Sequence, residues 1–217
     1  MTTFRTMRAR RAIDGLIPSV VTVGHGRGFV VECGHDRAVI TAAHCLPSFP
    51  PCRPDSYRRE RTYGRLLSAL GAKPTVWAEC LFADPIADIA VLGTPDGQEL
   101  YSQAEAYEQL VGGVTPLSIA HAPKQSCQPV QFGDLEIERR TSGGGSALVL
   151  SLEGEWIKCS VTRNTAWLSL EPQKFIRSGM SGSPIILANG RAIGLVSVSQ
   201  QSPVLMDSIP GRFLRHR

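Results

Sequence analysis

The chain has 217 residues and a formal net charge of +4, and 42% of its residues are hydrophobic while 19% are charged. This length and composition support a large buried core, which excludes intrinsic disorder and any need for a metal or a disulfide merely to fold. No apolar run reaches the roughly 18 residues of a membrane-spanning helix. The weak positive excess, clustered at Arg5–Arg11 and Arg58–Arg65, is typical of solvated segments, and no nucleic-acid partner is expected.

The six cysteines form no CxxC pair and no Cys/His metal spacing, so neither a metal nor another cofactor is predicted. The N-terminus is basic, but polar residues and Pro18 interrupt Leu16–Val23, which makes a poor signal-peptide core. Few candidate disulfides and no clear signal peptide favour a cytoplasmic location, and they leave secretion open.

Short runs of β-branched and aromatic residues alternate with Gly- and Pro-rich turns in the first half of the chain. They predict strands at Ser19–Val23, Phe29–Glu32, Arg37–Thr41, Arg65–Leu70, Thr75–Phe82 and Ile89–Leu92. Gly24–Gly28 is interpreted as the turn between the first two strands. A helix over Tyr57–Leu70 competes with the fourth strand, although Gly64 weakens that alternative.

One convincing helix is predicted over Glu99–Val111, where apolar residues at helical spacing precede a Gly-Gly pair. The second half then repeats the strand texture, with strands predicted at Pro129–Phe132, Ala147–Leu152, Glu155–Thr162, Trp167–Leu170, Pro184–Leu187 and Ala192–Val198. The expected fold is all-β, with two packed six-stranded β-barrels joined by a short interlobe helix. The expected organisation is a flexible segment 1–12, an N-terminal lobe 13–111, and a C-terminal lobe 112–217 with a short tail.

Three local motifs carry residues suited to chemistry. The segment Val39–Cys45 ends a strand with His44, the segment Ala83–Leu92 places Asp88 just before an apolar strand, and the segment Ser178–Pro184 places Ser181 between glycines. Each motif alone has an ordinary structural explanation. Together, in the order His, Asp, Ser, they predict a nucleophilic serine with its base and orienting acid.

These motifs resemble those of the trypsin/chymotrypsin-like serine proteases over nearly the whole chain. TAAHC at 41–45 and GMSGSP at 179–184 carry the resemblance. The segments Gly26–Val31 and Ala78–Leu92 are similar to the bacterial branch that includes HtrA-type and secreted trypsin-like peptidases. The resemblance implies a chymotrypsin-like fold with the catalytic residues His44, Asp88 and Ser181 in the cleft between the two barrels.

The chemistry explains why these residue types are needed. A serine hydroxyl is a weak nucleophile, so His44 would take its proton and return it to the leaving amine. Asp88 would hold the imidazole in the correct tautomer. Gly179 lacks a Cβ, so its N–H and that of Ser181 can form an oxyanion hole.

The sequence departs from the family pattern at several positions. Met180 stands where activatable enzymes carry an aspartate that receives a freed N-terminus, so no such activation is expected. The position of the usual disulfide partner of Cys45 is His25, and Arg177 replaces another family cysteine. Pairing of Cys33 with Cys45 stays open.

The resemblance also suggests which residues bind substrate. The pocket is expected to involve Phe175, Ile176, Ser197, Val198 and Ser199. Phe175 occupies the pocket-floor position, where preference for Arg or Lys requires a carboxylate, so a basic P1 residue is disfavoured. Val196 replaces a histidine of glutamyl endopeptidases, which disfavours an acidic P1, and an apolar or small P1 is expected.

The sequence therefore predicts a serine endopeptidase that acts through an acyl-enzyme on polypeptides. The alternative is a catalytically silent protease fold that serves as a peptide-binding module or as a regulatory or effector protein. No membrane partner is expected, and any regulatory subunit would be a separate polypeptide.

Overall fold

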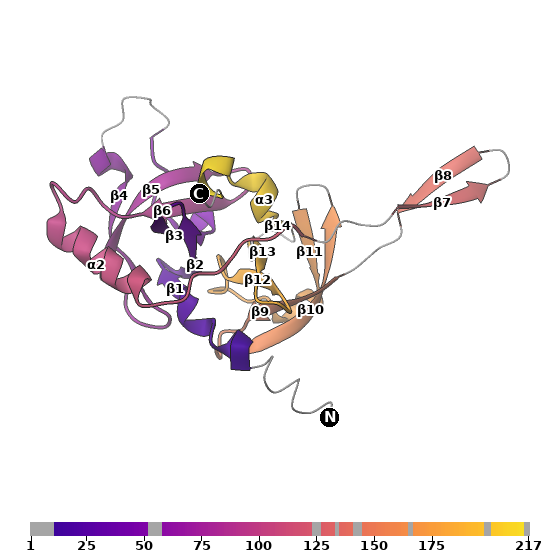
Figure 1. Cartoon of the computed structure of the whole chain (residues 1–217), viewed down its shortest axis with the longest axis horizontal. Coiled ribbons are helices and arrows are strands. Elements are labelled where there is room, and N and C mark those ends of the chain that lie inside the picture. Colours follow the sequence, from indigo (N-terminus) through magenta and orange to yellow (C-terminus); the bar gives the residue numbers. More distant parts are fainter. Residues whose placement is uncertain are drawn as a thin grey trace.

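The structure is a computed structural model that describes residues 11–51, 58–122, 127–132, 135–140, 145–164, 167–197 and 201–214. It consists mainly of antiparallel strands, with few helices, arranged as two barrels side by side (Figure 1). The predicted fold class is confirmed. Among these residues no helix is long and apolar enough to cross a lipid bilayer.

The first barrel is closed and has six strands in the order β1-β2-β3-β6-β5-β4. The strands are β1 Val20–Val23, β2 Gly26–Cys33, β3 Asp36–Thr41, β4 Thr62–Ala69, β5 Val76–Asp84 and β6 Ile89–Gly93. Their β-branched and aromatic residues fill the interior, and β6 is buried along its whole length. The sequence left a helix over Tyr57–Leu70 as the alternative to the fourth strand. In the structure this region forms the strand β4, preceded by the short helix η3, Arg58–Arg61.

The second barrel has six strands in the order β13-β12-β9-β10-β11-β14. They are β9 Gly145–Leu150, β10 Trp156–Asn164, β11 Trp167–Glu171, β12 Pro184–Leu187, β13 Ala192–Leu195 and β14 Ser202–Pro203. A single bridge between Gly194 and Val204 brings its two edges together, so this barrel is nearly closed. The two-residue β14 was not predicted, because a strand so short carries no periodicity.

A hairpin of β7, Cys127–Phe132, and β8, Leu135–Arg140, forms a separate sheet. It projects away from the second barrel (Figure 1). Of these two strands, the sequence predicted only β7, as Pro129–Phe132. It did not predict β8, because most residues of Leu135–Arg140 are charged. The second barrel therefore reaches six strands without this hairpin.

The predicted helix is α2, Tyr101–Gly112, and its apolar face packs on the first barrel. Ala104, Tyr107 and Val111 are buried, and the Tyr107 hydroxyl donates to the carbonyl oxygens of Arg37 and Leu92. Because this hydroxyl lies in the core, burial raises the pKa of Tyr107 well above its usual value. The other short helices are η1 Ile17–Ser19, η2 Ala43–Cys45, η4 Gln173–Phe175, α3 Leu205–Ser208 and η5 Gly211–Phe213.

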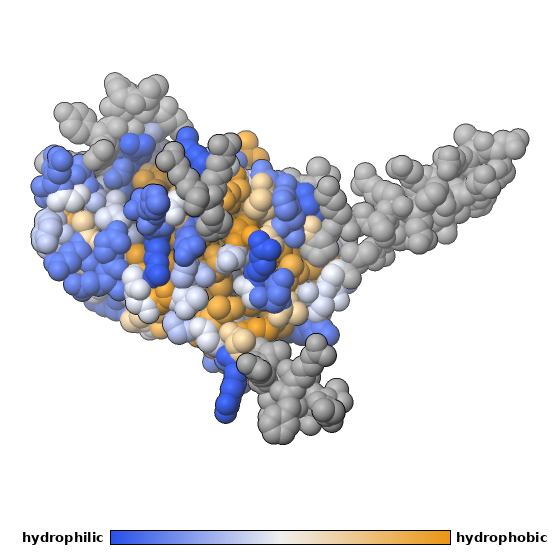
Figure 2. Space-filling view, in the orientation of Figure 1, coloured by the Kyte–Doolittle hydropathy of each residue, from blue (hydrophilic) through white to orange (hydrophobic). Residues whose placement is uncertain are grey.

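The chain after α2 crosses from one barrel to the other. Leu117 N–H donates to Val30 O of β2, and Ala120 N–H donates to Ala192 O of β13, both at 2.8 Å. The larger core cluster accordingly contains Ile186 and Leu195 of the second barrel together with the first-barrel interior. Figure 2 shows hydrophilic residues over α2 and apolar residues toward the middle of this face. The two barrels thus share a packed junction.

Candidate active site

His44 lies in η2, the single helical turn that follows β3. Thr41, Ala42 and Ala43 are buried and anchor this turn to the first barrel, whereas the His44 side chain is 34% exposed. The sequence thereby fixes the backbone at this point and leaves the imidazole free to face solvent or a ligand.

Asp88 lies directly before β6 and contacts His44 in three ways. The carboxylate oxygens lie 2.9 and 2.8 Å from Nδ1 of His44, and Oδ1 also accepts the His44 backbone N–H at 3.0 Å. Asp88 adopts a φ of 53°, a conformation that aspartate tolerates better than most residues. This turn aims the carboxylate at the imidazole, which leaves Nε2 for proton transfer.

Ser197, which follows β13, donates its hydroxyl to Oδ2 of Asp88 at 2.5 Å. The sequence predicted Ser197 only as a substrate-binding residue, yet its hydroxyl contacts the carboxylate of the other barrel. Ser197 is 4% exposed and the Asp88 side chain 17%, so this bond is partly buried. Asp88 is thus held from both barrels, with one oxygen shared between His44 and Ser197.

Ser181 lies in the loop between η4 and β12, flanked by two glycines in the left-handed region. Gly179 has a φ of 89° and Gly182 a φ of 81°. A Cβ on Gly182 would lie 1.8 Å from Arg27 O, so this position admits only glycine. Within the described residues, the N–H groups of Gly179 and Ser181 donate to no protein acceptor. Two unused donors beside a serine are what an oxyanion hole requires.

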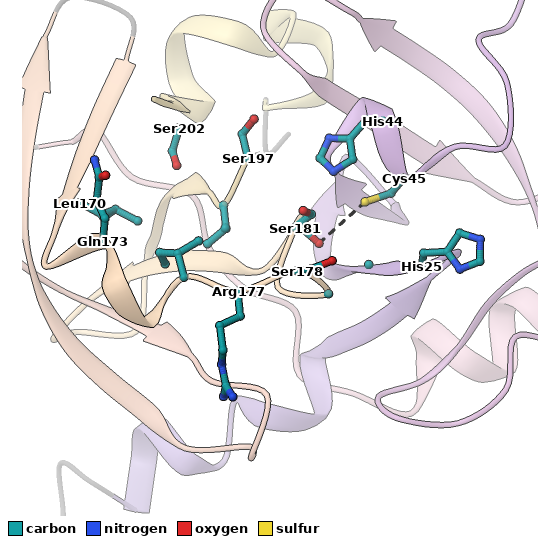
Figure 3. Close-up of a pocket in the computed structure, with 14 residues that line it drawn as sticks. His25, His44, Cys45, Leu170, Gln173, Arg177, Ser178, Ser181, Ser197 and Ser202 are labelled. Atoms are coloured by element: carbon teal, nitrogen blue, oxygen red, sulfur yellow. Dashed lines mark hydrogen bonds between the residues drawn. The ribbon is translucent and has the colours of Figure 1, made fainter. Parts of the chain in front are cut away.

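His44 and Ser181 line the same cavity, which has a volume of about 470 Å³ (Figure 3). No hydrogen bond joins Ser181 Oγ to the imidazole among the residues that the structure describes. Such contacts often tighten only when substrate binds. The remaining lining residues are His25, Gly26, Cys45, Leu170, Gln173, Ile176, Arg177, Ser178, Gly179, Val196, Ser197 and Ser202.

The predicted substrate-binding residues divide into three groups. Ile176 and Ser197 line the cavity, whereas Phe175 packs against the core of the second barrel. Val198 and Ser199 lie outside the described residues. No sequence pattern indicated Leu170, Gln173 and Ser202 as lining residues, because they reach the cavity through the pairing of β11 with β14 and through η4.

Cys45, the residue after His44, is a buried thiol that also lines the cavity. Burial raises the pKa of the Cys45 thiol to about 11, and this thiol lies 3.8 Å from Ser181 O. The four cysteines whose side chains are described, Cys33, Cys45, Cys80 and Cys159, are free thiols, so Cys33 does not pair with Cys45. Met180 is fully buried in the second core, where the activatable enzymes would need a carboxylate. In the described part of the chain, no group of three or more His, Cys, Asp or Glu residues could hold a metal ion.

Comparison with known proteins supports the fold. Deg5, whose crystal structure is known, aligns over 94% of this chain and 91% of its own, with 16% identity and a TM-score of 0.53. The Rv3671c protease of M. tuberculosis in an inactive form aligns over 90% and 86%, with 18% identity and a TM-score of 0.46. A human pathogenic astrovirus serine protease aligns over 88% and 91%, with 15% identity and a TM-score of 0.48. At such low identity, the likeness to Deg5 shows the fold alone.

No curated protein matches the chain. The family model described as a trypsin-like peptidase domain, however, matches residues 26–195, a range that includes His44, Asp88, Gly179 and Ser181. The match covers most of the sequence and all strands of the two barrels except β1 and β14. The chain therefore belongs to the trypsin-like peptidase family.

Proposed function

We propose that the protein is a serine endopeptidase in which Ser181 attacks the peptide carbonyl, His44 transfers protons and Asp88 orients His44. The observation that carries this proposal is the contact of both Asp88 carboxylate oxygens with His44 Nδ1, on the wall of the cavity that also holds Ser181. A side-chain pair of this geometry fixes the tautomer that leaves Nε2 as the acceptor for a serine proton.

The reaction would proceed by acyl transfer. As Ser181 Oγ bonds to the carbonyl carbon, its proton passes to His44 Nε2, and the carbonyl oxygen becomes an anion facing the N–H groups of Gly179 and Ser181. His44 then donates that proton to the leaving amine as the C–N bond breaks, which forms the acyl-enzyme. Water then attacks the ester carbonyl as His44 takes its proton, and His44 returns that proton to Ser181 Oγ as the C–Oγ bond breaks and the new C-terminal carboxyl product leaves. The reaction requires no cofactor.

The cavity wall favours an uncharged P1 residue. Leu170, Ile176 and Val196 supply apolar surface, and Ser197 and Ser202 are buried serines on the wall. Arg177, the one Arg or Lys of this lining, is paired with Glu153 and points away from Ser181 (Figure 3). Since no carboxylate lines the cavity among the described residues, the ion pair that selects Arg or Lys at P1 is missing there.

Digestion of a peptide library with mass-spectrometric readout tests both parts of this proposal. The wild-type protein and the Ser183→Ala variant are expected to cleave after apolar or small residues, and Ser181→Ala is expected to cleave nothing. Ser183 is the matched control because it is a buried serine two residues away in the same loop. Cleavage that persists in Ser181→Ala would contradict the role of Ser181, and dominant cleavage after Arg or Lys would contradict the P1 assignment.

A further inference from the structure

Arg27 is a buried cation that the proposed chemistry does not use. Only 6% of this residue is exposed, although it lies on β2 between two glycines. Burial lowers the pKa of Arg27, an effect that the charge of Glu153 opposes, yet a guanidinium remains charged at neutral pH. No carboxylate forms an ion pair with Arg27 within the described residues. A buried charge is costly unless other polar groups compensate it.

Backbone oxygens of the second barrel provide that compensation. Nη1 of Arg27 donates to Leu150 O and to Ser151 O, both at 2.9 Å, and approaches Ser183 Oγ at 3.5 Å. Leu150 ends β9 and Ser151 begins the turn that leads to β10. A side chain of the first barrel thus ties the end of a second-barrel strand to the loop that carries Ser181.

The backbone of Arg27 holds the same loop directly. Its N–H donates to Ser181 O at 2.7 Å, and its own carbonyl accepts the hydroxyl of the buried Thr41 at 2.7 Å. That carbonyl also lies against Gly182, where a Cβ would collide with it. Arg27 and Gly179 further line one smaller cavity of about 380 Å³. Arg27 therefore contacts the nucleophile residue itself, at Ser181 O, and the two residues that follow it, Gly182 and Ser183.

Within the loop, the polar contacts of Met180 are local: its Sδ accepts the Arg177 N–H at 3.4 Å, its N–H donates to Arg177 O, and its carbonyl accepts the Ser183 N–H. These contacts do not tie the loop to the first barrel. Met180 is buried among apolar residues of the second core. The exposed ion pair of Arg177 with Glu153 joins the start of the loop to the turn after β9, but an exposed pair contributes little. The hydrogen bonds of the Arg27 side chain are buried and short, and their donor is charged. They therefore restrain the loop more strongly than the exposed pair of Arg177 with Glu153.

We propose that Arg27 is a positioning residue that holds the Ser181 loop against the first barrel and the end of β9, with the Gly179 and Ser181 N–H groups free for an oxyanion. This inference rests on the proposed function for its catalytic consequence. Its structural part concerns the loop alone. Misplacement of reacting groups by about 1 Å costs roughly 100-fold in rate, so loss of the guanidinium is expected to slow acylation by about that factor.

The test compares Arg27→Met and Arg27→Lys with Arg37→Met. Arg37 is the matched control, because its Nη1 also donates to three backbone carbonyls, those of Val111, Gly112 and Val114, at the far end of β3 from His44. The rate of labelling by a fluorophosphonate and the hydrogen exchange of the amides in 177–183 are measured on samples shown by circular dichroism to be folded.

Arg27→Met is expected to label about 100-fold more slowly than wild type and to exchange faster in 177–183. The single ammonium of Arg27→Lys can reach one of the carbonyls. Its labelling rate and its exchange in 177–183 should therefore lie between those of wild type and of Arg27→Met. Arg37→Met should match wild type in both measurements even if it unfolds at a lower temperature. In a peptide assay the loss should fall on kcat rather than on KM, because the oxyanion contacts form in the transition state.

Two results would overturn the inference. In the first, folded Arg27→Met exchanges the amides of 177–183 at the same rate as wild type. In the second, Arg27→Met is labelled by the fluorophosphonate no more slowly than Arg37→Met. If wild type itself takes no label, the proposed function fails instead, and hydrogen exchange still decides whether Arg27 positions the loop. If Arg27→Met does not fold, Arg27→Lys decides by the same two measurements.

Discussion

The two barrels contribute to the site in different ways. The first barrel supplies side chains, His44 and Asp88, which sit at the ends of regular strands and are fixed by side-chain hydrogen bonds. The second supplies backbone groups and Ser181 from an irregular loop, whose shape depends on Gly179 and Gly182 and on contacts with Arg27. Substitutions that change the functional group should therefore have the larger effect at His44 and Asp88. Substitutions that add volume should have the larger effect in the loop that carries Ser181.

The largest effect is expected at Asp88, where Asn keeps the shape but changes the hydrogen bonding. An amide that donates to Nδ1 stabilises the wrong imidazole tautomer, and the expected loss of turnover is about 10⁴-fold. Asp84→Asn is the control, because Oδ1 of Asp84 only caps the neighbouring turn through the N–H groups of Ile86 and Ala87. Steady-state peptide hydrolysis measures both variants. Equal activities of Asp84→Asn and Asp88→Asn would contradict the role of Asp88.

A smaller loss is expected when volume is added to the loop of the second barrel. Gly182→Ala would place a methyl group against Arg27 O at a positive φ, and we expect the unfolding free energy to fall by about 3 kcal/mol or more. Gly154→Ala has a similar φ of 82° but nothing within 4 Å of its new Cβ. Its expected cost is about 1 kcal/mol, from backbone strain alone. Urea unfolding compares the two, and similar losses would show that the contact with Arg27 is unimportant.

The next effect in size is expected at Ser197 of the second barrel, whose hydroxyl donates to Asp88 of the first. Ser197→Ala removes a partly buried hydrogen bond to a carboxylate, and roughly tenfold slower turnover is expected. Ser68→Ala removes another buried serine hydroxyl, one that bonds to Ala72 O within the first barrel, and should leave turnover unchanged. A Ser197→Ala enzyme with wild-type kcat would show that His44 alone suffices to hold Asp88.

The smallest effect concerns two of the buried thiols away from the cavity, Cys80 in the first barrel and Cys159 in the second. Burial raises the pKa of Cys80 in the first barrel and of Cys159 in the second from 9.0 to about 11. The unfolded chain then loses these protons first, so the free energy of unfolding should fall as the pH rises from 9 to 11. Urea unfolding at pH 8 and at pH 10.5 measures this fall. Cys80→Ala and Cys159→Ala should each reduce it, and a fall unchanged in both variants would contradict the thiol assignment.

The same contrast between the barrels explains what the sequence could predict. The strands of the first barrel and the helix α2 followed from apolar periodicity, and His44 and Asp88 from their places beside apolar runs. Periodicity carries no information about irregular backbone, so β14 and the cavity wall at Gln173 and Ser202 were missed.

Arg27 shows the limit most clearly. The glycines around Arg27 predict that it lies in the turn over Gly24–Gly28. In the structure β2 begins at Gly26, and Arg27 is buried by a strand end more than a hundred positions away in the chain. Only the packing of one barrel on the other creates that environment, and local sequence does not encode it.

The account is tested most directly by locating the adduct that a fluorophosphonate forms with the folded wild-type protein. Tryptic peptides analysed by mass spectrometry should carry one phosphonyl group, on Ser181, and Ser183→Ala should label as wild type does. A folded protein that takes no adduct, or that takes it on another side chain while Ser181 stays unmodified, would contradict the claim that both barrels meet to activate this serine.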